Sequence, residues 1–454
     1  MKALPAGAET ESSDLTRTPV HRARGLVLLL AFLVARMSLV ALPATNPQGG
    51  ILVDSQRYLS LAAGIAVQGR YTDPTGQDFI WPAGYPLFIT LASGWSAPNP
   101  VAVAFVQLAM TGMIAVLVVA LGDRLGNRGV ALAGGWLYAL LPTAALWALT
   151  VMSETLFTVI LLLACLSWLA SIQRAQPLLG AAAGLALGLA AFVRPIGLAL
   201  VPLWVLLTVI ALRRDAGWRR ALAVGAATII GATMIVLPWS LRNLATHGVF
   251  AFSGVGERTF FNFNVAQVKA EAEGITRDQA ASELGTSSSN LVDSLRIITR
   301  YPGAFALEQA KGLFRTLFGL EAGSWARLLG YPEDLRSGLG IVSSLLEGDP
   351  GLAISRLVRV LANPKTGPII LLAAGSEALT VIVYGLAVVF IIWGRPKGSR
   401  AALLLASSAI LLAVLPAAAG QARFRTPIEP MLVVLAAWGG GFLLRRTRRA
   451  SAAR

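Results

Sequence analysis

The sequence predicts an all-α polytopic membrane protein, a bundle of about ten transmembrane helices with amphipathic helices in its outer-face loops. Apolar residues make up 56% of the chain and charged residues only 13%. The charges are gathered between apolar runs that are long enough to cross a bilayer. A soluble domain with so few charged residues would lack the polar groups that cover a surface in water.

The apolar runs follow one another along the chain and define its expected organisation. We expect transmembrane helices at residues 25–43, 100–121, 129–149, 154–172, 178–193, 195–212, 221–239, 369–393, 401–419 and 428–444. They leave a tail at 1–24, a transmembrane core at 25–239 with its first outer loop at 44–99, an amphipathic outer-face segment at 240–368, C-terminal helices at 369–444 and a basic tail at 445–454. No signal-peptide cleavage pattern precedes the first run, so we expect that run to be retained.

Basic residues are concentrated in the tails and short loops on one side of the predicted membrane. These segments hold half of the 38 Lys and Arg residues, among them Arg213, Arg214, Arg219 and Arg220. By the positive-inside rule this side is cytoplasmic, contains both termini and meets anionic membrane lipid. The net charge of +15 is thereby explained without nucleic acid as a partner.

The first outer loop contains a charged stretch at 53–88 that is longer than a simple connection needs. The helical spacing of apolar residues in its first half predicts a helix that begins near Asp54. A carboxylate at that position is typical of an N-terminal cap, stabilised by free backbone amides and the helix dipole. The alternative interpretation is a catalytic acid or base held at the membrane surface.

Further charged residues stand at the outer ends of later spans. They are Glu154, Arg194, Arg242 with its neighbour Asn243, Arg423 and Arg425. Each one alone is compatible with helix capping or interfacial anchoring. Because charges at this depth are costly and all of these lie on the same side, we expect them to share a polar site, covered by the segment 240–368.

The residue types in this set restrict the chemistry. The sequence has no HExxH, CxxC, GxSxG or Walker motif, and its histidines are only His21 and His247. We therefore expect no metal and no cofactor. Arginine binds phosphate well, and a carboxylate nearby suits general-base activation of a hydroxyl or amine with phosphate as the leaving group. No nucleotide-sugar pool is expected on the outer side, so we expect a lipid-borne donor.

The order of these motifs resembles that of the GT-C superfamily of integral membrane glycosyltransferases. The nearest relatives by this resemblance are bacterial enzymes similar to the protein O-mannosyltransferases and the lipid A aminoarabinose transferase. The matching motifs, between about 25 and 444, are Asp54, Arg57 and Tyr58 in DxxRY, Pro82–Phe88 with Tyr85 in PxGYPLF, Ser153-Glu154, Arg194-Pro195, Pro238-Trp239 with Arg242-Asn243, and Arg423 before Pro427.

The resemblance implies an inverting transfer of a sugar from a polyprenyl-phosphate donor to a lipid, glycan or protein acceptor, on the outer face of a bacterial inner (plasma) membrane. Asp54 matches the presumed base or acceptor-orienting group, and Arg242 the position expected to hold the donor phosphate. The expected substrate-binding residues are Arg57, Tyr58, Tyr85, Glu154, Arg194, Arg242, Asn243, Arg423 and Arg425. Ser55 replaces the second acid of many relatives, and Trp81 the lysine of the aminoarabinose transferase, so the sugar and acceptor stay open.

Three other functions are compatible with an outer-facing set of charged residues in a membrane protein. A flippase or transporter of a lipid-linked glycan needs polar groups along a path through the bilayer, and only Arg36 and Glu377 are charged residues well inside the predicted spans rather than at their ends. An outer-face oligosaccharide polymerase or ligase would use a lipid-pyrophosphate donor, which the Asp54 loop disfavours. A non-catalytic assembly factor is disfavoured by the concentration of charge at span ends. Formation of a glycosylated product from a lipid-phosphate sugar distinguishes the glycosyltransferase hypothesis from these alternatives.

Overall fold

The computed structural model describes residues 19–72, 78–285, 291–333, 340–346, 348–364, 366–393 and 399–452. Within these ranges the regular structure is helical, without a β-strand. Six of the described helices are long and apolar enough to cross a membrane. The predicted class, an all-helical multi-pass membrane protein, is confirmed. Residues 1–18 of the predicted tail lie outside the described chain.

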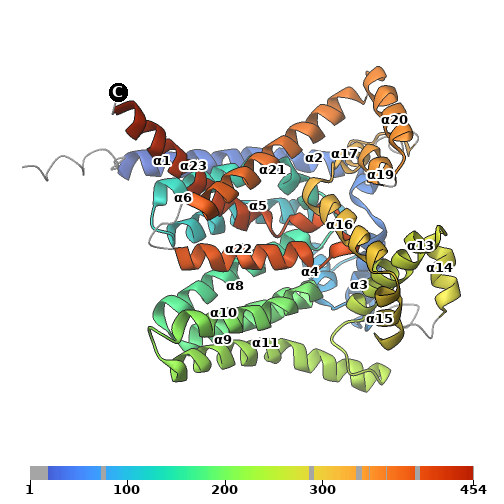
Figure 1. The fold of residues 1–454 in the computed structure, drawn as a ribbon, viewed down its shortest axis with the longest axis horizontal. Coiled ribbons are helices and arrows are strands. Elements are labelled where there is room, and N and C mark those ends of the chain that lie inside the picture. Colours follow the sequence, from blue (N-terminus) through green and yellow to red (C-terminus); the bar gives the residue numbers. More distant parts are fainter. Residues whose placement is uncertain are drawn as a thin grey trace, which may run out of the picture.

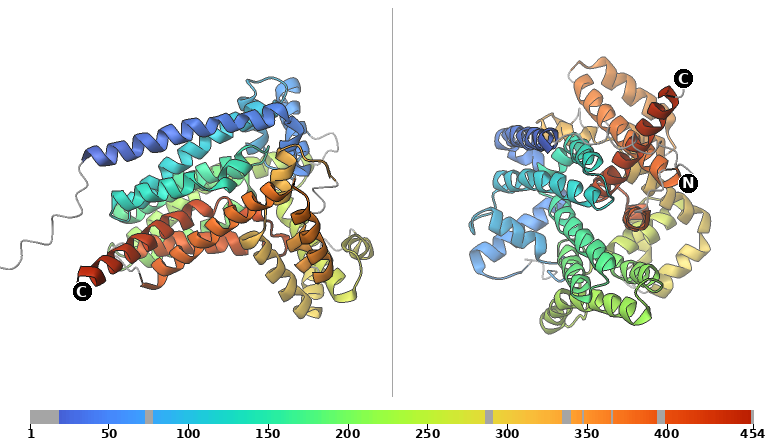
Figure 2. Two further views of the ribbon diagram at one scale, coloured as in Figure 1. Left: turned by 90° about the horizontal axis from the view of Figure 1, so that it is seen from above. Right: turned by 90° about the vertical axis from the view of Figure 1, so that its left-hand side faces the viewer.

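The long helices run side by side along the longest axis of the molecule (Figure 1; Figure 2, left). α8 and α9 pack together, α9 packs on α11, and α21 packs on α23. The elements of this bundle are α1 (Pro19–Arg36), η1 (Met37–Val40), α2 (Ala41–Thr45), α5 (Pro100–Asp123), α6 (Arg128–Ala139), α7 (Pro142–Ala148), α8 (Glu154–Arg174), α9 (Pro177–Val193), η3 (Pro195–Ala199), α10 (Leu200–Leu212), α11 (Trp218–His247), α21 (Gly367–Trp393), α22 (Ser399–Val414) and α23 (Glu429–Ala452).

Each of the ten predicted spans falls on helical structure, but the helices differ in length. Six cross a membrane by length and composition, and α6 with α7 makes a seventh candidate that bends by 56°. The bend lies at Pro142, which cannot donate a backbone hydrogen bond. α9 and the apolar part of α22 are shorter apolar helices, and α23 ends in several arginines. Length and composition therefore support six or seven spans, and the total of about ten stays a prediction.

The first outer loop folds as η2 (Pro47–Gly50), α3 (Val53–Gln68) and α4 (Gly84–Ala92). α3 begins where the helical spacing predicts and ends at Gly69, whose φ of 63° is the left-handed conformation that favours glycine. The N-cap residue of α3 is Leu52, and Asp54 lies within the first turn. The backbone N–H of Leu52 donates to Oγ of Ser55 at 2.9 Å. Asp54 is therefore not the N-cap residue, although the helix dipole still favours its charge.

The outer-face segment contains a series of short helices gathered at one end of the bundle, beside α3 and α4 (Figure 1). α11 continues to His247, beyond the predicted end of its span at residue 239, before this series begins. The helices are α12 (Val255–Thr259), η4 (Phe260–Ala266, a π-helix), α13 (Gln267–Glu273), α14 (Arg277–Leu284), α15 (Leu291–Arg300), α16 (Pro302–Phe318), α17 (Ala322–Leu328), α19 (Ile341–Leu346) and α20 (Pro350–Ala362).

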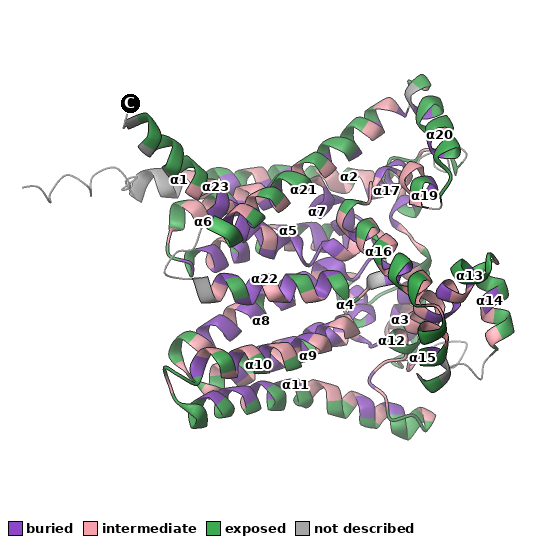
Figure 3. Cartoon of the chain, in the orientation of Figure 1, coloured by how far each residue is buried: buried purple, intermediate pink, exposed green. Residues whose placement is uncertain are grey.

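Close packing fixes the helices that carry the site. Buried residues are frequent on α8 and on the helices that pack against it, α5 and α9 (Figure 3). A Cβ atom at Gly184 would lie 1.9 Å from the carbonyl oxygen of Thr228, so the approach of α9 to α11 requires glycine there. On α8, the Trp168 ring stacks on Trp204 of α10, with 4.3 Å between ring centroids. α8 and α9 are thereby held as a rigid base for the polar residues at their outer ends.

Candidate active site

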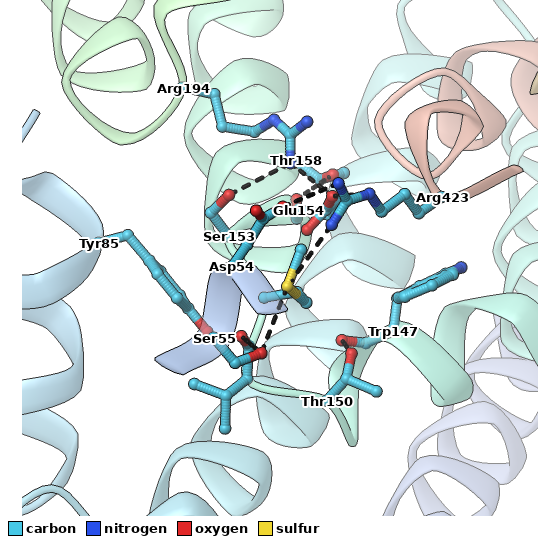
Figure 4. Close-up of polar contacts among 12 residues, drawn as sticks. Asp54, Ser55, Tyr85, Trp147, Thr150, Ser153, Glu154, Thr158, Arg194 and Arg423 are labelled. Atoms are coloured by element: carbon cyan, nitrogen blue, oxygen red, sulfur yellow. Dashed lines mark hydrogen bonds and ion pairs between the residues drawn. The ribbon is translucent and has the colours of Figure 1, made fainter. Parts of the chain in front are cut away.

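Two acids and two arginines from distant parts of the chain meet at the outer end of the bundle (Figure 4). Nη2 of Arg423, in η7 (Ala422–Arg425), donates to Oδ2 of Asp54 at 2.8 Å. Nη1 of Arg194 lies 2.5 Å from Oε1 of Glu154, the first residue of α8. Nε of Arg423 lies 3.9 Å from the same oxygen. The order Asp54–Arg423–Glu154–Arg194 is thus a chain of alternating charge, which we call the ion-pair chain.

Burial increases along the ion-pair chain from Asp54 to Glu154. The Asp54 side chain is 33% exposed, that of Arg423 14%, and that of Glu154 is fully buried. Burial alone lowers the pKa of Arg423, but the charges of Glu154 and Asp54 outweigh it and raise the pKa above its ordinary value. Of the two acids, Asp54 is therefore the one that a substrate can reach.

The turn between α7 and α8 holds the beginning of α3 in place. Oγ of Ser55 donates to the carbonyl oxygen of Val151 at 2.8 Å, and the N–H of Val151 donates to the carbonyl oxygen of Gly50 at 2.9 Å. Nη1 of Arg423 lies 3.7 Å from Sδ of Met152 in the same turn. Ser55 thus fixes its neighbour Asp54 against the bundle.

A cavity of about 420 Å³ lies beside Asp54. One wall is formed by Val53, Asp54, Gln56 and Arg57 of α3, together with Ile80 and Trp81 ahead of α4. A second part of the lining comes from α12 and η4 of the outer-face segment. A volume in this range suits a small ligand such as a sugar phosphate. Of the predicted substrate-binding residues, Arg57 is the one that lines this cavity.

Tyr58 and Tyr85 lie behind the cavity wall in the core. Their rings meet edge to face with centroids 4.9 Å apart, and Tyr58 also meets the edge of Trp81 at 5.5 Å. Burial raises the pKa of Tyr58 to about 12. The hydroxyl of Tyr85 lies 2.9 Å from Oε1 of Gln107 on α5. These tyrosines support the wall that holds Asp54 and Trp81, and their predicted contact with substrate stays a prediction.

Arg242 ties the first outer loop to the end of α11, and Asn243 holds the chain that follows α11. Nη2 of Arg242 donates to Oδ2 of Asp78 at 2.6 Å and to the carbonyl oxygen of Tyr71 at 3.0 Å. Nδ2 of Asn243 donates to the carbonyl oxygen of Ala251 at 2.8 Å. Burial by itself raises the pKa of Asp78, but the hydrogen bond and charge of Arg242 outweigh it and lower the pKa. Arg242 is thus already paired with a carboxylate, and its predicted role in phosphate binding stays a prediction.

Arg425 belongs to a second buried cluster, although only Phe424 separates it from Arg423. Its guanidinium lies 2.8 Å from Glu377 of α21 and 3.3 Å from Glu429 at the start of α23. Both oxygens of Glu429 lie 3.0 Å from the hydroxyl of Thr143 in α7. The cluster links α7, α21 and α23. The Arg425 side chain is 2% exposed and is not among the residues that line the cavity.

The ion-pair chain brings together the predicted residues Asp54, Glu154, Arg194 and Arg423. Sequence reasoning did not single out Gln56 or the cavity residues of α12 and η4. These α12 and η4 residues recur at helical spacing, at 255, 258, 259, 262 and 263, which is the one signal that predicts a shared face. Within the described ranges, no three His, Cys, Asp or Glu residues gather as a metal site.

No protein-family model matches the chain, and no curated protein matches it. Among solved structures the chain is similar to the archaeal oligosaccharyltransferase AglB from Archaeoglobus fulgidus in complex with an inhibitory peptide and a dolichol-phosphate. The TM-score is 0.49 and the identity 14%, with 94% of this chain and 51% of that chain covered.

The chain is also similar to the Archaeoglobus fulgidus oligosaccharyltransferase tethered to an acceptor peptide with the NVT sequon, with a TM-score of 0.48, 13% identity and coverage of 94% and 51%. For the apo form the values are 0.49, 15%, 94% and 52%. The chain thus spans about half the length of these proteins. At such identities and TM-scores, its function has to be argued from its own site.

Proposed function

We propose that this protein is an inverting glycosyltransferase that moves a sugar from a polyprenyl-phosphate donor to a lipid, glycan or protein acceptor. The observation that supports this most directly is a carboxylate, Asp54, held at the wall of a cavity large enough for a sugar phosphate. The order of motifs that resembles the GT-C superfamily supports the same assignment. Asp54 acts as the general base, and Arg423 orients its carboxylate.

In the proposed reaction, an acceptor hydroxyl or amine gives its proton to the Asp54 carboxylate. The acceptor atom forms a bond to the anomeric carbon from the face opposite the phosphate. The bond between the anomeric carbon and the phosphate oxygen breaks, and its electron pair leaves with the polyprenyl phosphate. This single displacement inverts the anomeric configuration. Glu154, Arg194 and Arg423 keep Asp54 aligned while the charge moves.

The proposed orientation places the cavity on the periplasmic or extracellular side of a bacterial inner membrane. The α10–α11 turn and the end of α23, both rich in arginine, lie at the end of the bundle opposite α3 (Figure 1). By the positive-inside rule, the arginine-rich end is cytoplasmic. The donor lipid then reaches the site from the outer leaflet.

The charged residues within the predicted spans favour chemistry over a transport path. The guanidinium of Arg36 donates to the carbonyl oxygens of Ala139 and Leu141 at 3.0 and 3.2 Å, where the α6–α7 bend frees these groups. Glu377 pairs with Arg425 at 2.8 Å. Both in-span charges are therefore satisfied by structural partners.

The test uses purified protein in nanodiscs, a panel of radiolabelled polyprenyl-phosphate monosaccharides, and an extract of membrane lipids and glycans. We expect wild type to consume one donor and Asp54→Asn to lose this activity by about 10²-fold or more. Because Asp54 is partly exposed, the variant should keep the wild-type melting temperature. Wild-type turnover by Asp54→Asn would exclude it as the base. Movement of intact donor across the bilayer without a glycosylated product would favour a flippase instead.

A further inference from the structure

The cavity beside Asp54 has a second wall that comes from the outer-face segment. Val255, Arg258 and Thr259 of α12 and Asn262 and Phe263 of η4 line it. The spacing of these five residues places them along one face of the continuous α12–η4 helix. Nδ2 of Asn262 donates to the carbonyl oxygen of Arg258 at 2.9 Å, one turn away. η4 is a π-helix. This form is rare in proteins overall, but where it occurs it is often at a functional site.

Two arginines, Arg57 of α3 and Arg258 of α12, line this cavity. The charge of Asp54 is matched by Arg423 and that of Glu154 by Arg194. Among the described residues, none forms an ion pair with Arg258, whose side chain is exposed at the cavity wall. An unmatched guanidinium in a cavity whose carboxylate is already paired makes the cavity favourable for an anion. Arginine presents several N–H donors in a planar fork that fits phosphate oxygens.

Resting on the proposed function, we infer that Arg258 binds the phosphate of the lipid donor. Asp54 lines the same cavity from α3, so phosphate held by Arg258 keeps the donor sugar beside the proposed base. An inverting displacement needs the acceptor, and the base that takes its proton, on the face of the anomeric carbon away from the phosphate. Trp81 and Phe263 supply aromatic surface in the same cavity, and Gln56 and Asn262 supply amides for sugar hydroxyls.

This assignment differs from the one that the motif order implies. Arg242 was expected to hold the donor phosphate, but its guanidinium is 2.6 Å from Asp78, and the residues that line the cavity do not include it. A phosphate at Arg242 would have to displace that carboxylate. Arg258 offers the same chemistry without such a competitor among the described residues.

The test measures binding of a polyprenyl monophosphate, which carries no sugar, to wild type, Arg258→Gln and Arg258→Lys in detergent. Uncharged polyprenol of the same length is the reference lipid. Arg300→Gln is the matched control, since Arg300 lies on α15 of the same segment, stacked over the ring of Tyr301. We expect wild type to prefer the phosphate lipid, Arg258→Gln to lose about 10-fold or more of this affinity, Arg258→Lys to keep part of it, and Arg300→Gln to match wild type.

Equal binding by wild type and Arg258→Gln would overturn the inference, as would equal affinity of wild type for polyprenol and polyprenyl phosphate. Competition by inorganic phosphate, without preference for the lipid form, would also overturn it, because the site would then be one for free phosphate. If wild type binds the phosphate lipid through Arg258 but turns over no donor, the proposed function fails while the phosphate site stands.

Discussion

The Arg423 guanidinium and the Asp54 carboxylate lie 369 residues apart in sequence and 2.8 Å apart in space. Asp54 lies in the first turn of α3 in the first outer loop, whereas Arg423 lies in the hairpin between α22 and α23. Their contact joins the N-terminal and C-terminal parts of the bundle at the site. It also gives the base a fixed direction, because one of its two oxygens is held by a partly buried cation.

Arg423→Gln should lower kcat by about 10²-fold with a smaller change in KM, because Asp54 loses the group that orients it. Arg423→Lys should restore only part of kcat, since an ammonium cannot reproduce the planar contacts to both Asp54 and Glu154. The measurement is steady-state kinetics with the donor found in the panel. Arg425→Gln serves as the contrast and should lower the melting temperature, because it breaks the buried cluster with Glu377 and Glu429. A pure KM effect in Arg423→Gln would contradict the positioning role.

Arg194→Gln should destabilise the protein by about 3–5 kcal/mol, because it leaves the fully buried Glu154 with less compensating charge. The double variant Glu154→Gln/Arg194→Gln should recover a large part of this loss, since both charges are then absent. Thermal unfolding in detergent is followed for the two single variants and the double variant, and gives the coupling free energy between Glu154 and Arg194. Additive losses in the double variant would show that the pair is not coupled.

Glu321→Gln should change how stability depends on pH. Burial raises the pKa of Glu321 to about 7, against an ordinary value of 4.5. Between pH 4.5 and about 7, Glu321 therefore keeps a proton in the folded protein that it releases in the unfolded chain. This contribution to stability is full below about pH 4.5 and is lost as pH rises through 7. We expect the variant to melt above wild type at pH 8 and to lose this advantage at pH 5; parallel pH profiles would argue against a raised pKa.

Local patterns in the sequence account for most of the helices. The apolar runs predict the spans, and the spacing after Asp54 predicts α3, because burial against lipid or core selects apolar residues at these positions. The predicted span at 178–193 matches α9, whereas the bend between α6 and α7 is not predicted. A run such as 129–149 has the length of one span whether or not it breaks at Pro142. Hydropathy averaged over a run does not report helix direction.

The site was predicted only in part, because ion pairs between distant residues leave no local pattern. Glu154, Arg194 and Arg423 were grouped by their position at span ends, and Asp54 was proposed separately from the outer-loop helix; the structure brings these four together. Arg423 and Arg425 were grouped too, yet residues two apart on a helical turn face different directions. Arg258 was missed because nothing nearby in the sequence relates α12 to Asp54.

The long separation between Asp54 and Arg423 has a consequence for how the protein is made. α3 and α8 are synthesised long before the hairpin that supplies Arg423. Until that hairpin enters the membrane, the nascent chain carries Asp54 and Glu154 with one of their two arginines still missing. The site is therefore completed only once η7 has been made, and a chain cut short before η7 has a charge imbalance at its outer surface.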